Sequence, residues 1–132
     1  MPRQPARHLP GYRDRQQDWD DHFDRTRRRE IAALIDDDVT TEHQLNPIGY
    51  RACHSWKLQR VLNYMRVQPV LGKYFVYPEK AWEKYRIAVI HERGHPPVVL
   101  DEHIYRSEEE AMHAIFLLRA EEIVTSVKEH VR

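Results

Sequence analysis

A change of hydrophobic period within residues 56–90 constrains the fold of this chain more than any other feature. At the start of this stretch apolar side chains recur at i, i+3, i+4 and i+7, which predicts an amphipathic helix with Ser55 as its N-cap. Pro69 and Gly72 are expected to end this helix. We expect its buried stripe to contain Leu58, Val61, Leu62 and Met65, and we expect Arg60, Asn63 and Tyr64 to lie off that stripe.

After this helix the sequence becomes typical of strands. Residues 73–77 and 85–91 are rich in β-branched and aromatic side chains, which predicts two strands. Residues 78–84 between them begin with a proline, whose fixed φ suits the first position of a helix, so we expect a helical turn there. Residues 94–97 predict a turn, and residues 98–100 predict a third short strand.

Two helices are predicted before residue 46. The first begins near Asp14 and is expected to end at the three aspartates 36–38, because acidic side chains are unfavourable at a helix C-terminus. Asp38 or Thr40 is then expected to cap a short second helix that reaches about Leu45.

The last predicted helix has the clearest start. Ser107 is followed three residues later by Glu110, which forms a capping box. The wide apolar face of this helix is expected to contain Met112, Phe116, Ala120, Ile123, Val124 and Val127. Ile115 and Leu118 point elsewhere, which predicts a second apolar contact.

Together these elements predict one α+β domain over residues 13–132, with a helical majority. Its helices flank a small antiparallel sheet of about three strands. Residues 1–12 contain three prolines among polar side chains and are expected to form an extended N-terminal arm.

Charge and cysteine content argue against several classes of protein. Lys and Arg number 21, as do Asp and Glu, and this balance argues against general binding to nucleic acid or to a membrane surface. Cys53 is the only cysteine, so an internal disulfide cannot form and a reducing compartment fits best. Because no signal peptide or membrane-spanning stretch is recognised, we expect a soluble cytoplasmic protein.

Residues 91–95 match the H-E-x-x-H pattern of zinc hydrolases. In those enzymes the motif is helical, so that both histidines bind one zinc ion while the glutamate activates its water. Here the motif follows a predicted strand, and the proline after His95 disfavours a helical backbone at that residue. Asp101 stands where a third ligand could fall. A small zinc hydrolase using His91, Glu92 and His95 is therefore one alternative, and a surface turn is favoured over it.

No other arrangement in the sequence assembles an active site, and no glycine-rich phosphate loop is present among four glycines. Tyr64, Tyr74, Arg60 and Arg66 could stack on bases of single-stranded RNA, but the neutral net charge argues against it. A free-standing module that binds protein or RNA is a second alternative. We assign no catalytic residue, cofactor or metal ligand to this chain.

Aromatic side chains favour a contact surface instead. Seven of the thirteen aromatic residues lie within residues 56–90, and Tyr and Trp suit surfaces that are half buried against another molecule. The candidate interface residues are Arg60, Tyr64, Tyr74, Tyr77 and Trp82, together with Ile115 and Leu118 of the last predicted helix.

Several segments resemble the small subunit of bacterial N,N-dimethylformamidase. They are GYRDRQQDW (11–19), LNPIGYR (45–51), LQRVLNYMRVQP (58–69), GKYFVYPEKAWEKYRIAVI (72–90) and EEEAMHAIFLLR (108–119). The resemblance covers nearly the whole chain, and its segments are packing and contact motifs rather than catalytic signatures.

The resemblance implies a role in an amidohydrolase that cleaves dimethylformamide to dimethylamine and formate. It further implies two large and two small chains, or multiples of these, with the active site in the large chain. There a mononuclear iron is held by tyrosine and glutamate side chains of the large chain, so the tyrosines of this sequence are not its ligands. We therefore expect a small chain that docks on the large chain and binds no cofactor itself.

Overall fold

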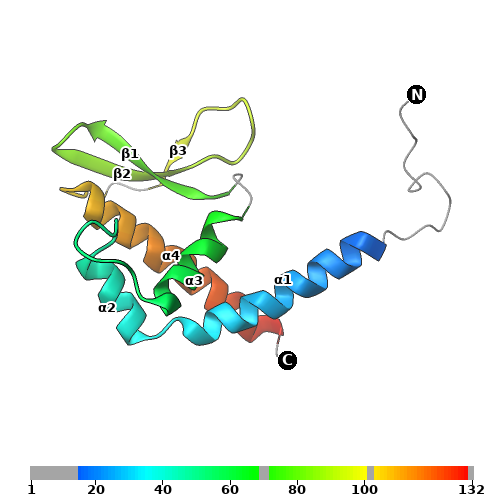
Figure 1. Ribbon diagram of the computed structural model, residues 1–132. Helices are drawn as coiled ribbons and strands as arrows, with labels where there is room; N and C mark the ends of the chain where they lie inside the picture. Colours follow the sequence, from blue (N-terminus) through cyan, green and yellow to red (C-terminus); the bar gives the residue numbers. More distant parts are fainter. Residues whose placement is uncertain (1–14, 69–71, 101–102, 131–132) are drawn as a thin grey trace, which may run out of the picture.

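The computed structural model describes residues 15–68, 72–100 and 103–130. These residues form α1 (Arg15–Leu34), α2 (Asp37–Leu45), α3 (Trp56–Arg66), β1 (Tyr74–Lys80), β2 (Lys84–Val89), β3 (Val98–Val99) and α4 (Glu108–His130). Figure 1 shows the sheet on one side of the helices, with α4 running beneath it. The predicted α+β class, with a helical majority and a three-stranded antiparallel sheet, is confirmed. The predicted arm, residues 1–12, lies outside the described residues.

The main core lies between the helices. Its buried side chains come from all four helices: Ile31, Val39, Leu58, Val61, Tyr64, Met65, Phe116, Ala120 and Ile123. Full burial of one large aliphatic or aromatic side chain stabilises a fold by about 1.5–3 kcal/mol. On α3 the predicted stripe is confirmed, because three of its four residues are buried and Leu62 packs against the core from its margin.

Tyr64 departs from the predicted pattern. Its side chain is only 4% exposed and belongs to the core, so the prediction that it lies off the buried stripe of α3 is wrong. The reason is that α1 packs against α3, and core residues of α4 belong to the same cluster, so that α3 buries a wider face than one stripe. A tyrosine tolerates such burial when its hydroxyl finds hydrogen-bond partners.

The strands β1 and β2 form an antiparallel hairpin, and β3 pairs with the other side of β2. The predicted helical turn over residues 78–84 is wrong, because Pro78 continues β1 and only a tight turn joins the strands. The N–H of Glu83 donates to the carbonyl oxygen of Lys80 at 3.1 Å and closes that turn. A proline is tolerated here because β1 is an edge strand, where a missing N–H need not break a ladder.

The start of α2 also corrects a prediction. Asp36 is the N-cap, and its carboxylate accepts a hydrogen bond from the N–H of Val39 at 2.8 Å. Asp38 and Thr40, the two predicted caps, lie inside the helix. The first of three consecutive aspartates takes this position because α1 already ends at Leu34, which leaves Asp36 free to adopt an extended backbone.

The other two predicted caps are confirmed. The Ser55 hydroxyl accepts from the N–H of Leu58 at 3.3 Å at the start of α3. The Ser107 hydroxyl accepts from the N–H of Glu110 at 3.1 Å at the start of α4. The Glu110 carboxylate returns this contact one residue earlier than expected, by accepting from the N–H of Arg106 at 3.2 Å.

Candidate partner interface

Trp82 lies at the tip of the β1–β2 hairpin and is the most exposed aromatic side chain among the described residues. It is 89% exposed, and its backbone has a φ of 72°, a left-handed conformation that bulky residues rarely adopt. The backbone N–H of Trp82 donates to the Tyr85 hydroxyl at 3.0 Å. An ion pair of 2.8 Å joins Lys80 and Glu83 on either side of the turn. The indole is therefore held outward on a fixed turn rather than on a loose loop.

The N-terminal half of α1 carries a further pair of exposed aromatic residues. The rings of Trp19 and Phe23 stack with centroids 5.8 Å apart, and both side chains are more than half exposed. Figure 1 shows this end of α1 projecting beyond the other helices. An exposed aromatic pair on a projecting helix is typical of a protein contact, because aromatic residues are enriched at interfaces.

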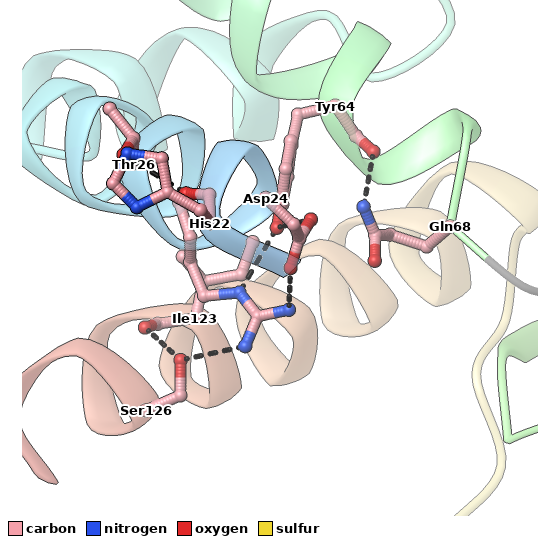
Figure 2. A network of polar contacts seen from close by, with 8 residues as sticks. His22, Asp24, Thr26, Tyr64, Gln68, Ile123 and Ser126 are labelled. Carbon is pink, nitrogen blue, oxygen red and sulfur yellow. Dashed lines mark hydrogen bonds and ion pairs between the residues drawn. The ribbon is translucent and has the colours of Figure 1, made fainter. Parts of the chain in front are cut away.

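A polar network joins α1, α3 and α4 beside the core (Figure 2). The Arg28 guanidinium donates to the Tyr64 hydroxyl at 3.0 Å, to the Asp24 carboxylate at 2.8 Å and to the Ser126 hydroxyl at 3.5 Å. The Tyr64 hydroxyl in turn donates to the other Asp24 oxygen at 3.0 Å. The hydrogen bond from Arg28 to the Tyr64 hydroxyl is the largest cause of the raised pKa of the Arg28 guanidinium. Burial is the largest cause of the raised pKa of Tyr64.

The same network borders a cleft of about 340 Å³ between α1, α3, α4 and the start of β1. On its α4 side the Tyr74 hydroxyl donates to the Glu122 carboxylate, which raises the pKa of Tyr74 to about 12. Because its polar groups are hydrogen-bonded to one another, we interpret the cleft as a structural contact between the helices and the sheet and not as a binding site.

A second depression, of about 310 Å³, runs beside β1. We call it the β1 groove. Its apolar lining comes from α3, β1 and α4, namely Leu62, Met65, Phe75, Val76, Met112, Ile115 and Phe116, with His43 of α2 beside them.

Three cations, Arg66, Lys73 and Arg119, also line the β1 groove. Lys73 and Arg119 donate to the carbonyl oxygens of Arg66 and Met65, the last turn of α3. Burial lowers the pKa of Lys73, and the charges of Arg119 and Arg66 lower it further. Cations near a helix C-terminus are favourable, so this cluster both stabilises the end of α3 and makes the groove electropositive.

The sequence-predicted interface residues fall into three groups. Arg60, Tyr77 and Trp82 are exposed, and Arg60 lies 3.6 Å from the Glu30 carboxylate in a surface ion pair. Tyr64 lies in the core, and the partly buried side chain of Tyr74 donates to Glu122. Ile115 lines the β1 groove, and Leu118 lines a shallow depression on α4. The structure therefore does not gather these seven residues into one site.

The zinc-like motif lies in an exposed turn, as expected. Residues 91–95 contain no helix, and Gly94 has a φ of 80°. The Glu92 carboxylate lies 3.2 Å from Nε2 of His95, its neighbour across the turn. Among the described residues no three His, Cys, Asp or Glu side chains are grouped so as to hold a metal ion. The helical geometry that zinc hydrolases require is not formed by this segment.

The family of the chain follows from comparison with known proteins. The family model of the N,N-dimethylformamidase alpha subunit matches residues 18–130. The chain belongs to this family. The predicted resemblance is thereby confirmed. Three of the five segments that carried it lie in α3, in the β1–β2 hairpin and in the first half of α4, and the segment 45–51 follows α2.

Two N,N-dimethylformamidase alpha subunits show how much of the chain is shared. The one from Paracoccus aminophilus is 51% identical over 114 residues, which cover 85% of this chain and 80% of that protein. The one from Alcaligenes sp. is 50% identical over 114 residues, which cover 85% of this chain and 86% of that protein. These alpha subunits are thus of similar length to this chain. In the part of this family member that the structure describes, no helix is long and apolar enough to cross a membrane.

Sequence reasoning missed one polar pair in this alpha-subunit fold. Nδ1 of His43 lies 2.9 Å from Nδ1 of His113, so one imidazole donates and the other accepts. His43 also stacks on Phe116 with ring centroids 4.1 Å apart. Burial, and then the charge of His113, lower the pKa of His43 to about 4. The two histidines are 70 residues apart in sequence, so no local pattern predicts that they pair. The apolar neighbours of each histidine were the only sequence signal that it is buried.

Proposed function

We propose that this chain is a non-catalytic subunit of an amidohydrolase that cleaves dimethylformamide to dimethylamine and formate. Membership of the N,N-dimethylformamidase alpha-subunit family supports the reaction and supports a partner subunit. The observation that carries the docking role is the display of Trp82, which stays 89% exposed on a strained but well-held turn. A strained conformation maintained at an exposed aromatic residue is a cost to the isolated chain that a bound partner offsets.

The active site, in this proposal, lies in the larger partner subunit and uses an iron ion held there. This chain contributes no ligand to that metal. Two large and two small chains, or multiples of these, make up the enzyme. Tyr64 and Tyr74 support this division of roles, because their hydroxyls are engaged with Arg28, Asp24 and Glu122. A cytoplasmic location fits the exposed, unpaired thiol of Cys53.

Among the candidate interface residues, we propose that Trp82, Tyr77 and Arg60 contact the partner. All three present their side chains to solvent on the hairpin or on α3. Ile115 and Leu118 are proposed to contribute through the groove and depression that they line.

Separate and combined expression tests the proposal. The purified chain is expected to release no dimethylamine from dimethylformamide, and activity is expected only after the partner subunit is co-expressed. Metal analysis of the complex should find iron, and the isolated chain should carry none. Robust hydrolysis by the isolated chain, or an active partner that never co-purifies with it, would contradict the proposed role.

A further inference from the structure

The sheet has an open edge beside the β1 groove. Its strand order is β1-β2-β3, so β1 is paired on one side only. An unpaired edge presents a row of backbone N–H and C=O groups, which is a template for one more strand.

The hydrogen bonds of β2 show which residues of β1 direct their backbone groups outward. Successive residues of an antiparallel strand direct their backbone groups to opposite sides. The N–H and C=O of Tyr85 bond to Tyr105 at 2.9 and 2.8 Å, and the carbonyl oxygen of Ile87 accepts from Leu100 at 2.9 Å. These residues of β2 therefore direct their backbone groups away from β1.

In the register of the hairpin, Val76 lies opposite Ile87 and Tyr74 lies opposite Val89. Residues opposite one another in an antiparallel pair direct their backbone groups either both inward or both outward. Val76 and Tyr74 thus direct their N–H and C=O groups away from β2. Within the described ranges, no hydrogen bond reaches the backbone of either residue from that side.

The β1 groove adjoins this edge. Phe75 and Val76 of β1 line one part, Leu62 and Met65 of α3 line another, and α4 contributes most of the remaining apolar lining. A groove bounded by an edge strand and a helix accepts an extended chain, whose alternate side chains can enter the apolar lining while its backbone pairs with the strand.

The charge of the groove defines its occupant further. Arg66, Lys73 and Arg119 line it, and no carboxylate does among the described residues. A second copy of β1 would bring another Lys73 toward this cluster. An acidic segment of a different chain is the better complement, because opposite charges stabilise an interface and like charges disfavour it.

The geometry points to strand addition: an extended segment of the partner subunit pairs with Tyr74 and Val76 of β1, places apolar side chains in the β1 groove and sets a carboxylate against Arg66, Lys73 and Arg119. This inference rests on the proposed function, since it names how the partner is held. The added strand is short, because the register shifts between Pro78 and Lys80 and Pro78 has no N–H to offer.

Amide hydrogen exchange tests the pairing directly. The amides of Tyr74 and Val76 should exchange quickly in the isolated chain and about tenfold or more slowly in the complex with the co-expressed partner subunit. The amides of Phe75 and Tyr77 face β2, so they should be protected in both states and serve as internal controls.

A proline substitution tests the same backbone group chemically. Val76→Pro removes the outward N–H and leaves the β1–β2 ladder intact, because that N–H does not pair with β2. We expect the variant to fold, as shown by circular dichroism, and to retain about tenfold less partner subunit on affinity purification. Val76→Thr keeps the N–H and the β-branched shape, so it should retain the partner as the parent chain does.

Charge reversal at Arg66 tests the proposed contact between the cations of the groove and a carboxylate of the partner. Arg66→Glu should weaken retention of the partner, and raising the salt concentration should weaken the parent complex in the same way. Arg29→Glu is the matched control, because Arg29 is exposed on α1 and does not line the groove.

Three results would overturn strand addition. If the complex forms while the amides of Tyr74 and Val76 exchange as in the free chain, the partner docks elsewhere and the proposed function stands. If these amides become protected in the free chain as its concentration rises, the occupant is a second copy. If they are protected at every concentration and deleting residues 1–14 exposes them, the occupant is the chain's own N-terminal segment. Failure to form any complex would instead reject the proposed function.

Discussion

Nε of Arg28 lies 3.0 Å from the hydroxyl oxygen of Tyr64, and this contact joins α1 to α3 across 36 residues of sequence. The same guanidinium reaches Ser126 on α4, so one side chain links three helices at the margin of the core. Asp24 accepts from both members of the pair and balances the charge of Arg28. A satisfied polar network of this kind fixes how helices are arranged, because each lost contact leaves a half-buried polar group unpaired.

Tyr64→Phe is expected to lower the free energy of unfolding by about 1–2 kcal/mol. The ring stays in the core, but Arg28 and Asp24 each lose a partner in a half-buried position. Urea unfolding followed by circular dichroism measures the change. Tyr77→Phe removes an exposed hydroxyl and should change stability by less than about 0.5 kcal/mol. Equal effects of the two substitutions would show that the network does not stabilise the fold.

The His43–His113 pair predicts acid sensitivity. The folded-state pKa of His43, about 4, lies below its ordinary value of 6.5, so the unfolded chain binds the proton more tightly. The stabilisation is therefore fully present above pH 6.5 and is lost as the pH falls toward 4, by up to about 3 kcal/mol. Denaturant unfolding at a series of pH values measures this loss.

Two matched variants test whether His43 is the source of this dependence of stability on pH. His43→Gln keeps a group that can hydrogen-bond to His113 but cannot titrate, so stability should depend less on pH between 4 and 6.5. His91→Gln changes an exposed histidine of the turn and should leave the pH profile unchanged. A parent-like slope in His43→Gln would assign the acid sensitivity to other groups.

Trp82→Gly should separate stability from assembly. Glycine adopts a φ of 72° without steric cost, and this gain offsets its larger loss of backbone freedom. Thermal unfolding of the isolated chain should thus be unchanged or shifted upward by the equivalent of about 1 kcal/mol. Retention of the partner subunit should fall, because the exposed indole is gone. Unchanged retention in both Trp82→Gly and Trp82→Ala would remove Trp82 from the interface.

Local sequence rules predicted the elements of this fold well where one interaction decides them. Ser55 and Ser107 cap helices because a hydroxyl next to free N–H groups is favourable in almost any context. The spacing of Leu58, Val61 and Met65 likewise places one face of α3 in the core. Three of the five segments that carried the family resemblance likewise coincide with packed elements, namely α3, the β1–β2 hairpin and α4.

Sequence rules failed where distant elements decide the outcome. Tyr64 is buried because α1 packs on a second face of α3 and shares the core with α4, which no pattern within α3 records. Pro78 extends β1 because it lies on an edge, and edge position is a property of the whole sheet. The β1 groove also escaped prediction, because its lining combines residues from four elements between positions 43 and 119.

Tyr74 offers a spectroscopic test of the joint between β1 and α4. Its hydroxyl donates to Glu122, and this bond raises its pKa to about 12. Because the folded-state pKa is raised, the bond stabilises the fold below the ordinary pKa of 10, and this stabilisation is lost as the pH rises toward 12. In an ultraviolet titration Tyr74 should ionise late, and so should Tyr64, whose pKa is raised by burial. Tyr74→Phe should remove the step that belongs to Tyr74. Glu122→Gln should move the step toward pH 10 by removing the charged acceptor. If the late change in absorbance is as large in both variants as in the parent chain, none of it belongs to Tyr74 and the β1–α4 joint does not depend on this bond.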